Sequence, residues 1–130
     1  MTAFAAATLY FGLFGLLMLA LKINVGRVRG KEKVMFGDGA NEAMQRAIRV
    51  QGNAVEDVPI VLIGIAGLAA LSAPVMLIHA LGGSFLAGRI LHAIGLGGSS
   101  GSSFGRMVGT LVTLIVQLVT AGACIWFALT

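Results

Sequence analysis

Long stretches without a charged residue constrain the fold of this 130-residue chain more than any other feature. The first covers residues 2–21 and the longest covers residues 58–88. A helix needs about 20 apolar residues to cross a bilayer. The chain is 58% hydrophobic and 11% charged, whereas roughly a quarter of the residues in a water-soluble domain are charged. We therefore expect an integral membrane protein built from helices, since the alternating pattern of a membrane β-barrel is absent.

Breaks in the apolar stretches divide the chain into four expected helices. Residues 58–88 are too many for one membrane span and slightly too few for two, and Ser72, Ala73 and Pro74 lie at their middle. Proline ends or starts helices, so two helices should meet there. We expect one domain over residues 1–130, a transmembrane four-helix bundle with helices at about 2–24, 40–71, 74–95 and 104–129.

The connections between these helices are rich in glycine. Four glycines interrupt the segment that follows the first helix: Gly26, Gly30, Gly37 and Gly39. Asp38 or Asn41 is suited to cap the second helix. Residues 95–105 form the only low-complexity segment and should be a flexible linker.

Basic residues concentrate just after the first apolar stretch, where five of the nine lie within residues 22–33. Cytoplasmic loops of membrane proteins have such an excess of lysine and arginine. The first and third connections should therefore be cytoplasmic, with both termini outside the cytoplasm. The net charge of +4 belongs largely to this loop and does not indicate nucleic-acid binding. The first stretch is too long for the core of a signal peptide and no basic segment precedes it, so we expect a helix there.

A narrow polar stripe precedes the longest apolar stretch. If residues 46–59 are helical, Arg46, Arg49, Asn53 and Glu56 fall within an arc of roughly 80°. Arginine binds carboxylates with two parallel hydrogen bonds, and glutamate accepts from ammonium groups, so the stripe suits a ligand with carboxylates and an amine. Alternatively, the charges only pair with one another or lie among lipid headgroups. We favour this alternative for the loop residues Arg27, Arg29, Lys31 and Lys33. For Arg49, Asn53 and Glu56 together with Arg89 we favour function, because ionisable groups within a membrane are usually functional.

The register of the helical hairpin predicts what lies opposite the stripe. Glu56 and Arg89 are equally far from a turn centred between residues 72 and 73, so they should lie at the same depth, with His92 level with Asn53. This depth falls just inside the cytoplasmic edge of the hydrocarbon layer, where an unpaired charge costs at least ~2.5 kcal/mol. Glu56 and Arg89 can neutralise each other there. Asp57 points about 100° away, toward a neighbour or the lipid boundary.

The last expected helix has a polar face. Its polar residues recur at spacings of four, three, four and three, which places them on one side of a helix. They are Arg106, Thr110, Thr113, Gln117 and Thr120. This face should point into the bundle or into a subunit interface. Gly105 and Gly109 lie on nearly the same side and indicate close helix packing.

The histidines and the cysteine are the remaining residues that could take part in chemistry. His92 is equally suited to general acid–base catalysis and to a structural hydrogen bond, whereas His79 stands alone in an apolar helix and should be structural. Cys124 is the only cysteine and should be a small core residue. No cysteine and histidine spacing indicates a metal site.

Two motifs resemble those of a known family. They are Arg49-x-x-x-Asn53-x-x-Glu56-x-x-Pro59 at the start of the second membrane helix and Arg89-x-x-His92 on the third. Together they are similar to the MAPEG family, the membrane-associated proteins of eicosanoid and glutathione metabolism, and look closest to its bacterial-type members. Size, span number and motif order agree over essentially the whole chain. The resemblance implies a homotrimer in the bacterial inner membrane, with glutathione bound between adjacent subunits near the cytoplasmic face.

The resemblance also implies roles for individual residues. Arg106 would stabilise the glutathione thiolate, since a thiol pKa of about 8.5 must be lowered for attack at neutral pH, and His92 would assist catalysis. By matching position, Arg49, Asn53 and Glu56 would bind glutathione, Arg89 would assist, and a loop arginine, Arg27 or Arg29, would reach a carboxylate. Arg46 joins this set as part of the polar stripe rather than through the resemblance. The expected reaction is thiolate attack on a lipophilic electrophile, or reduction of a lipid hydroperoxide, with glutathione as co-substrate and without a metal.

One position departs from the family pattern. Many catalytic members have a tyrosine four residues after the position of His92, where this chain has Leu96, and its only tyrosine is Tyr10. This departure bears on catalysis more than on the fold. Two alternatives stay open: a non-catalytic protein of the same fold, whose polar rim binds lipid headgroups or stabilises the trimer, and a small transporter or channel. Against a transporter, no charge lies near the middle of any span.

Overall fold

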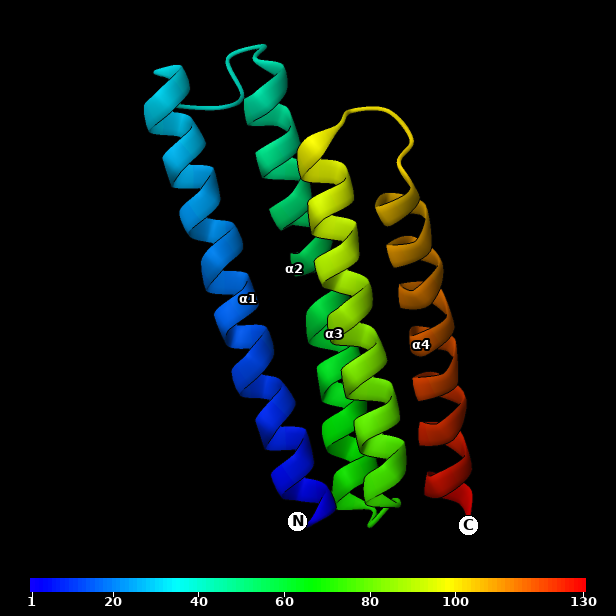
Figure 1. Cartoon of the computed structure of the whole chain (residues 1–130). Helices are drawn as coiled ribbons and strands as arrows, with labels where there is room; N and C mark the ends of the chain where they lie inside the picture. Colours follow the sequence, from blue (N-terminus) through cyan, green and yellow to red (C-terminus); the bar gives the residue numbers. More distant parts are fainter.

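The structure, a computed structural model, describes all residues from 1 to 130 and consists of four helices without strands. These are α1 (Ala3–Glu32), α2 (Glu42–Ala70), α3 (Val75–Gly98) and α4 (Phe104–Leu129). Each helix is long and apolar enough to cross a membrane, which confirms the predicted all-α membrane fold. Consecutive helices run antiparallel, so both termini lie at the same end of the bundle (Figure 1).

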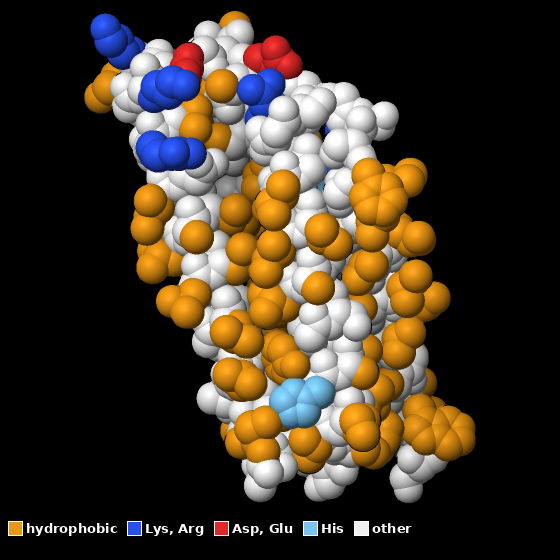
Figure 2. All heavy atoms as spheres, viewed as in Figure 1, with side chains coloured by type: hydrophobic (Ala, Val, Ile, Leu, Met, Phe, Trp, Pro, Cys, Tyr) orange, Lys and Arg blue, Asp and Glu red, His pale blue; other side chains and the backbone are white.

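Helices α2 and α3 form the centre of the bundle. Both contact α1 on one side and α4 on the other, and α1 does not touch α4. The core contains Phe14, Ile65 and Phe85, and the rings of the two phenylalanines lie 4.9 Å apart. Large apolar side chains cover the outside along the length of the bundle, as a surface that faces lipid requires (Figure 2).

Lysine, arginine and acidic side chains gather at the opposite end from the termini (Figure 2). This end, called the basic end below, contains the α1–α2 and α3–α4 loops (Figure 1). The first helix continues beyond its predicted end near residue 24, through Gly26 and Gly30, to Glu32. A glycine inside a helix costs only about 1 kcal/mol relative to alanine, and the packing of α1 against α2 offsets this cost.

Asn41 is the residue that caps α2. Its side chain accepts a hydrogen bond of 2.9 Å from the backbone N–H of Met44. Asp38, the other predicted cap, accepts from the backbone N–H of Ala40 within the loop, and this bond lowers the pKa of its carboxyl group. The second helix therefore begins at Glu42, close to the predicted position.

Glycines bring α3 and α4 into close contact. A Cβ atom on Gly88 would lie 2.7 Å from Val112 Cγ1, and one on Gly109 would lie 2.5 Å from the Gly88 carbonyl oxygen. At the basic end, a Cβ on Gly105 would lie 3.4 Å from the Cα of Gly95. The predicted close packing at Gly105 and Gly109 is confirmed. The third helix continues to Gly98, so the linker is shorter than the predicted residues 95–105.

The polar face of α4 turns mostly inward. Thr113 and Thr120 are buried and Gln117 is half-buried, whereas Thr110 is exposed. The prediction that this face points into the bundle is confirmed for its central part.

Candidate functional site

Arg49, Asn53 and Glu56 share one side of α2 at the basic end. Nη1 of Arg49 lies 2.9 Å from Oε1 of Glu56, and the two side chains are 59% and 56% exposed. The side-chain amide of Asn53 donates to the Arg49 carbonyl at 3.2 Å. An exposed ion pair contributes only about 0–1 kcal/mol, so a ligand can replace either partner at little cost.

Arg46 lies one turn earlier on α2 and is engaged within the chain. Its guanidinium lies 3.1 Å from the Glu42 carboxylate and donates to the Ser100 hydroxyl at 3.0 Å. Ser100 in turn donates to Glu42. These contacts join α2 to the α3–α4 loop. Ser100 was not among the predicted residues, because nothing in a serine-rich linker indicates which hydroxyl meets α2.

Arg89 pairs with Asp57, and the predicted pair with Glu56 is wrong. Nη1 of Arg89 lies 2.9 Å from Oδ2 of Asp57, and Arg89 is only 3% exposed. The two residues of α2 differ by one position, which turns a helix by about 100°. Asp57 therefore faces α3, the first of its two expected orientations, while Glu56 faces outward and pairs with Arg49.

His92 lies inside the bundle, one helical turn from Arg89. Its Nδ1 and the Nε of Arg89 are both buried without a hydrogen-bond partner. No hydrogen bond joins His92 to Asn53, and its backbone is packed so closely against α4 that a Cβ on Gly109 would lie 2.6 Å from His92 Cβ. A buried polar group without a hydrogen-bond partner lowers the stability of the fold by about 1–3 kcal/mol. A water or a ligand that bonds to these two nitrogens would remove this cost.

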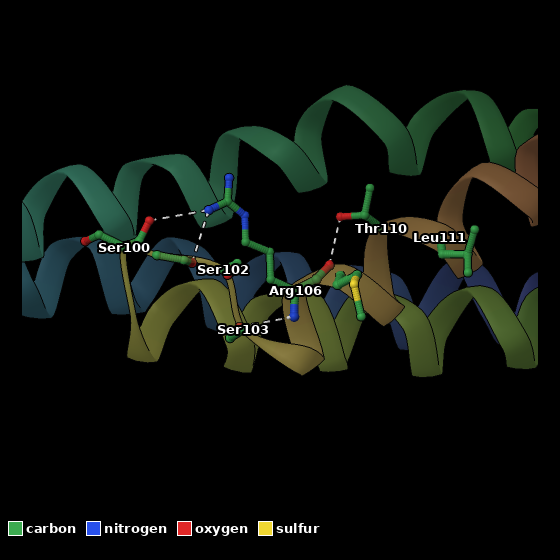
Figure 3. Close-up of a pocket in the computed structure, with 8 residues that line it drawn as sticks. Ser100, Ser102, Ser103, Arg106, Thr110 and Leu111 are labelled. Atoms are coloured by element: carbon green, nitrogen blue, oxygen red, sulfur yellow. Dashed lines mark hydrogen bonds between the residues drawn. The ribbon is translucent and has the colours of Figure 1, made fainter.

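A pocket of about 500 Å³ opens at the N-terminal end of α4, lined by the serines of the linker and by Arg106 (Figure 3). Ser103 caps the helix by accepting from the backbone N–H of Arg106 at 3.3 Å. The Arg106 guanidinium donates only to the carbonyl oxygens of Ser100 and Gly101, each at 3.4 Å. The three arginines described above all pair with carboxylates, whereas Arg106 does not. Its charge is therefore available to an anion.

Arg27 and Arg29, predicted to lie in the first loop, belong to the last turns of α1 and differ in their contacts. Arg29 donates to the carbonyl oxygens of Val34 and Gly37, each at 3.0 Å, and so holds the end of α1 to the loop. Arg27 is exposed and donates to the side chain of Asn24 on its own helix at 2.9 Å. Of the two, Arg27 has the guanidinium that is freer to meet a partner outside the chain.

The predicted site residues thus fall into separate groups. The α2 stripe is open to the surroundings, Arg89 and His92 are enclosed with Asp57, and Arg106 lines its own pocket at the end of α4. Leu96, at the position where many catalytic relatives have a tyrosine, is 4% exposed and belongs to the interior. No three histidine, cysteine or acidic side chains meet in a way that could hold a metal ion.

Four antiparallel helices that can span a membrane, with arginines and acids at one end, define a small multi-pass α-helical membrane protein. The sequence pattern of the MAPEG family matches residues 7–126, and the chain belongs to this family. The inner membrane protein YecN of Escherichia coli K12 is 36% identical over 89 residues, which are 68% of this chain and 68% of YecN. An uncharacterized protein of Synechocystis sp. is 35% identical over 115 residues, with 79% of this chain and 83% of that protein covered. No solved structure matches the chain.

Proposed function

We propose that this protein is a glutathione-dependent transferase or peroxidase that acts on lipophilic electrophiles or lipid hydroperoxides. Its membership of the MAPEG family supports a role in glutathione or eicosanoid metabolism. We place it in the bacterial inner membrane, in keeping with the description of YecN as an inner membrane protein. The basic end faces the cytoplasm, because cytoplasmic loops are enriched in lysine and arginine, and both termini lie outside it.

The observation that supports this proposal most is the exposed Arg49–Glu56 pair on the open side of α2 at the basic end. Glutathione has two carboxylates and one ammonium group. In the complex, Arg49 binds a carboxylate through two parallel hydrogen bonds and Glu56 accepts from the ammonium group. The amide of Asn53, which lies between them, completes the contact. The weak ion pair between Arg49 and Glu56 is thereby replaced by two ion pairs, one from each side chain to the ligand.

The site would be completed by a neighbouring subunit of a homotrimer. The stripe lies on the outer surface of a single chain, so a ligand bound there has one side uncovered. Arg27, exposed near the end of α1, would reach the second carboxylate from the adjacent subunit. Arg46 would bind the ligand by opening its contact with Glu42, and Arg89 would support the inner wall while held by Asp57.

Arg106 has the charge required to activate the thiol. It has no carboxylate partner, and a guanidinium beside the sulfur favours the thiolate and lowers the thiol pKa from about 8.5. The thiolate electron pair then forms a bond to carbon of the electrophile, and the leaving group departs with its bonding electrons. With a hydroperoxide, two glutathione molecules are oxidised to the disulfide while the hydroperoxide is reduced to an alcohol and water. His92 would take up the proton that the thiol releases, at its Nδ1, which has no hydrogen-bond partner in the chain.

Glutathione binding tests the proposal directly. The purified protein in detergent should show a glutathione-dependent rise in unfolding temperature at millimolar ligand. Arg49→Ala and Glu56→Ala should each abolish this rise, and glutathione acetylated on its amine should lose the contribution of Glu56. Lys31→Ala, which removes an exposed charge in the last turn of α1 and outside the stripe, is the control and should bind normally. Absence of any shift in the wild-type protein would remove the main support for the enzyme.

A second function is favoured by two specific observations. Arg49 and Arg89 each have an acidic partner within the chain, and Leu96 replaces a tyrosine with a buried apolar side chain. These features suit a non-catalytic member of the family whose polar rim binds lipid headgroups or stabilises the trimer. The two functions differ in turnover. An enzyme converts a lipophilic electrophile to its glutathione conjugate, or a lipid hydroperoxide to its alcohol, whereas the non-catalytic protein does neither.

A further inference from the structure

A second pocket lies between α2 and α4, far from the basic end. Its volume is about 260 Å³, close to the lower end of the usual range for small-molecule sites, roughly 300–1,000 Å³. Its lining includes Ile60, Ile63 and Gly64 from α2 and Gln117, Thr120 and Cys124 from α4. Counting at about 1.5 Å per residue, Gly64 lies roughly 13 Å from the α2–α3 turn, near the middle of a hydrocarbon layer about 30 Å thick.

The hydroxyl group of Thr120 is the unusual feature of this pocket. Thr110 and Thr113, on the same helix, each donate their hydroxyl to the carbonyl four residues earlier at 2.8 Å. Thr120 makes no such bond, although its side chain is 3% exposed and its Oγ1 is buried. Bulk water does not reach a hydroxyl at the middle of a membrane, and Thr120 lines the pocket, so a molecule held there can supply the missing partner.

Gly64 explains why Thr120 has this orientation. A Cβ on Gly64 would lie 2.6 Å from the Thr120 methyl group and 3.6 Å from the Cys124 sulfur. Only glycine leaves room for the methyl group to pack against α2. The Cys124 thiol donates to the Gly64 carbonyl at 3.4 Å, so it is satisfied within the chain. Gln117 lies half-buried at the same pocket, and its amide makes no hydrogen bond within the chain.

We propose that this pocket binds an uncharged, lipid-soluble molecule with an apolar body and one hydrogen-bonding oxygen, a hydroxyl or a carbonyl. The oxygen pairs with the Thr120 hydroxyl and the Gln117 amide, and the apolar body lies against Ile60 and Ile63. A charged ligand is excluded because no ionised side chain lines the pocket, and an unpaired charge at this depth is costly. The site lies about two helical turns deeper than Glu56 and does not depend on glutathione binding.

Photolabelling can test this site in the full-length protein reconstituted in lipid nanodiscs. The probes are a long-chain alcohol with a diazirine group and the matched diazirine alkane without the hydroxyl. Mass spectrometry maps the labelled peptides. We expect the alcohol to label residues 60–64 and 117–124 several-fold more than the alkane does. The groove between α3 and α4 around Leu81 and Val116 is the internal control, and the two probes should label it equally.

Substitutions separate the hydroxyl contact from general lipid exposure. Thr120→Val keeps the shape of the side chain and should remove the preference for the alcohol, whereas Thr113→Val should keep it because that hydroxyl is already bonded to Gly109. Gly64→Ala should reduce labelling by both probes, and Gly67→Ala, where a Cβ meets no atom within 4 Å, should not. Gln117→Leu provides a second test if Thr120→Val does not fold.

Three results would overturn the proposal. The first is equal labelling by the alcohol and the alkane in the wild-type protein. The second is an alcohol preference that survives in folded Thr120→Val and Gln117→Leu. The third is a pocket that neither probe labels because another chain covers it.

Discussion

The guanidinium of Arg89 lies 2.9 Å from the carboxylate of Asp57, inside the bundle and near its basic end. Arg89 is almost fully buried, so its charge depends on this one acidic partner. Glu56, the preceding residue on α2, pairs with Arg49 on the open face. The two adjacent acidic residues therefore differ in role. Asp57 neutralises the buried charge of Arg89, and Glu56 remains accessible to a ligand.

Asp57→Ala should destabilise the protein by about 3–5 kcal/mol, because it leaves the Arg89 charge buried and uncompensated. Glu56→Ala breaks an exposed pair and should cost about 0–1 kcal/mol. Unfolding in detergent, followed by helical circular dichroism, measures both. The double variant Asp57→Leu with Arg89→Met removes both charges and should recover most of the loss. Equal stabilities of Asp57→Ala and Glu56→Ala would contradict the interior role of Asp57.

Arg106→Ala should raise the pH at which bound glutathione ionises, toward the value of about 8.5 for a free thiol. The physical reason is the loss of a cation that has no other carboxylate to neutralise it. The ultraviolet absorbance of the thiolate, followed against pH, reports the change. Arg106→Lys retains the charge and should shift the titration less. If Arg106→Ala binds glutathione and its titration is unchanged, another group stabilises the thiolate.

The helices could be predicted from the sequence more closely than their partners. Uncharged stretches, Pro74 and the glycine-rich linker mark where spans begin and end, and α4 occupies the predicted residues 104–129. The end of α1 could not be predicted from the sequence. Gly26 and Gly30 each lower the helix propensity by a small amount, and the packing of α1 against α2, which is known only from the folded structure, offsets this loss.

The polar side chains that gather at the basic end could be named from the sequence, but not their pairing. Neighbouring residues of a helix point about 100° apart. An error of one residue in the predicted hairpin register is therefore enough to name Glu56 instead of Asp57 as the partner of Arg89. The contact of Ser100 with Glu42 and Arg46 depends on the path of a linker without periodicity, and no local pattern specifies it.

Gly109→Ala should destabilise the protein by about 1–3 kcal/mol, since overpacking a close contact forces neighbouring atoms to move. The added methyl group would lie 2.5 Å from the Gly88 carbonyl oxygen and 2.6 Å from the His92 backbone nitrogen, and backbone atoms cannot yield as flexible side chains do.

Gly122→Ala, on the same helix with no atom within 4 Å, is the matched control. It should be neutral or more stable by up to about 1 kcal/mol, from helix propensity. Thermal unfolding of both variants in one detergent measures the difference, and similar midpoints would show that α3 and α4 can separate without cost.

Tyr10→Phe should destabilise the protein by about 0.5–1.5 kcal/mol, the net contribution of one hydrogen bond. The Tyr10 hydroxyl lies 3.0 Å from Nδ1 of His79, and this hydrogen bond links α1 to α3 at the end of the bundle opposite the basic end. The tyrosine ring packs directly on Gly82, where a Cβ atom would collide with it. Phenylalanine keeps this ring in place and removes only the hydroxyl group. His79→Phe removes the contact with Nδ1 but leaves the His79 carbonyl, to which the Tyr10 hydroxyl also donates at 3.3 Å, so it should cost no more than Tyr10→Phe. The double variant should cost less than the sum of the two single losses, because the contact with Nδ1 is lost in both. Additive losses in this double-mutant cycle would show that Tyr10 and His79 stabilise the bundle independently.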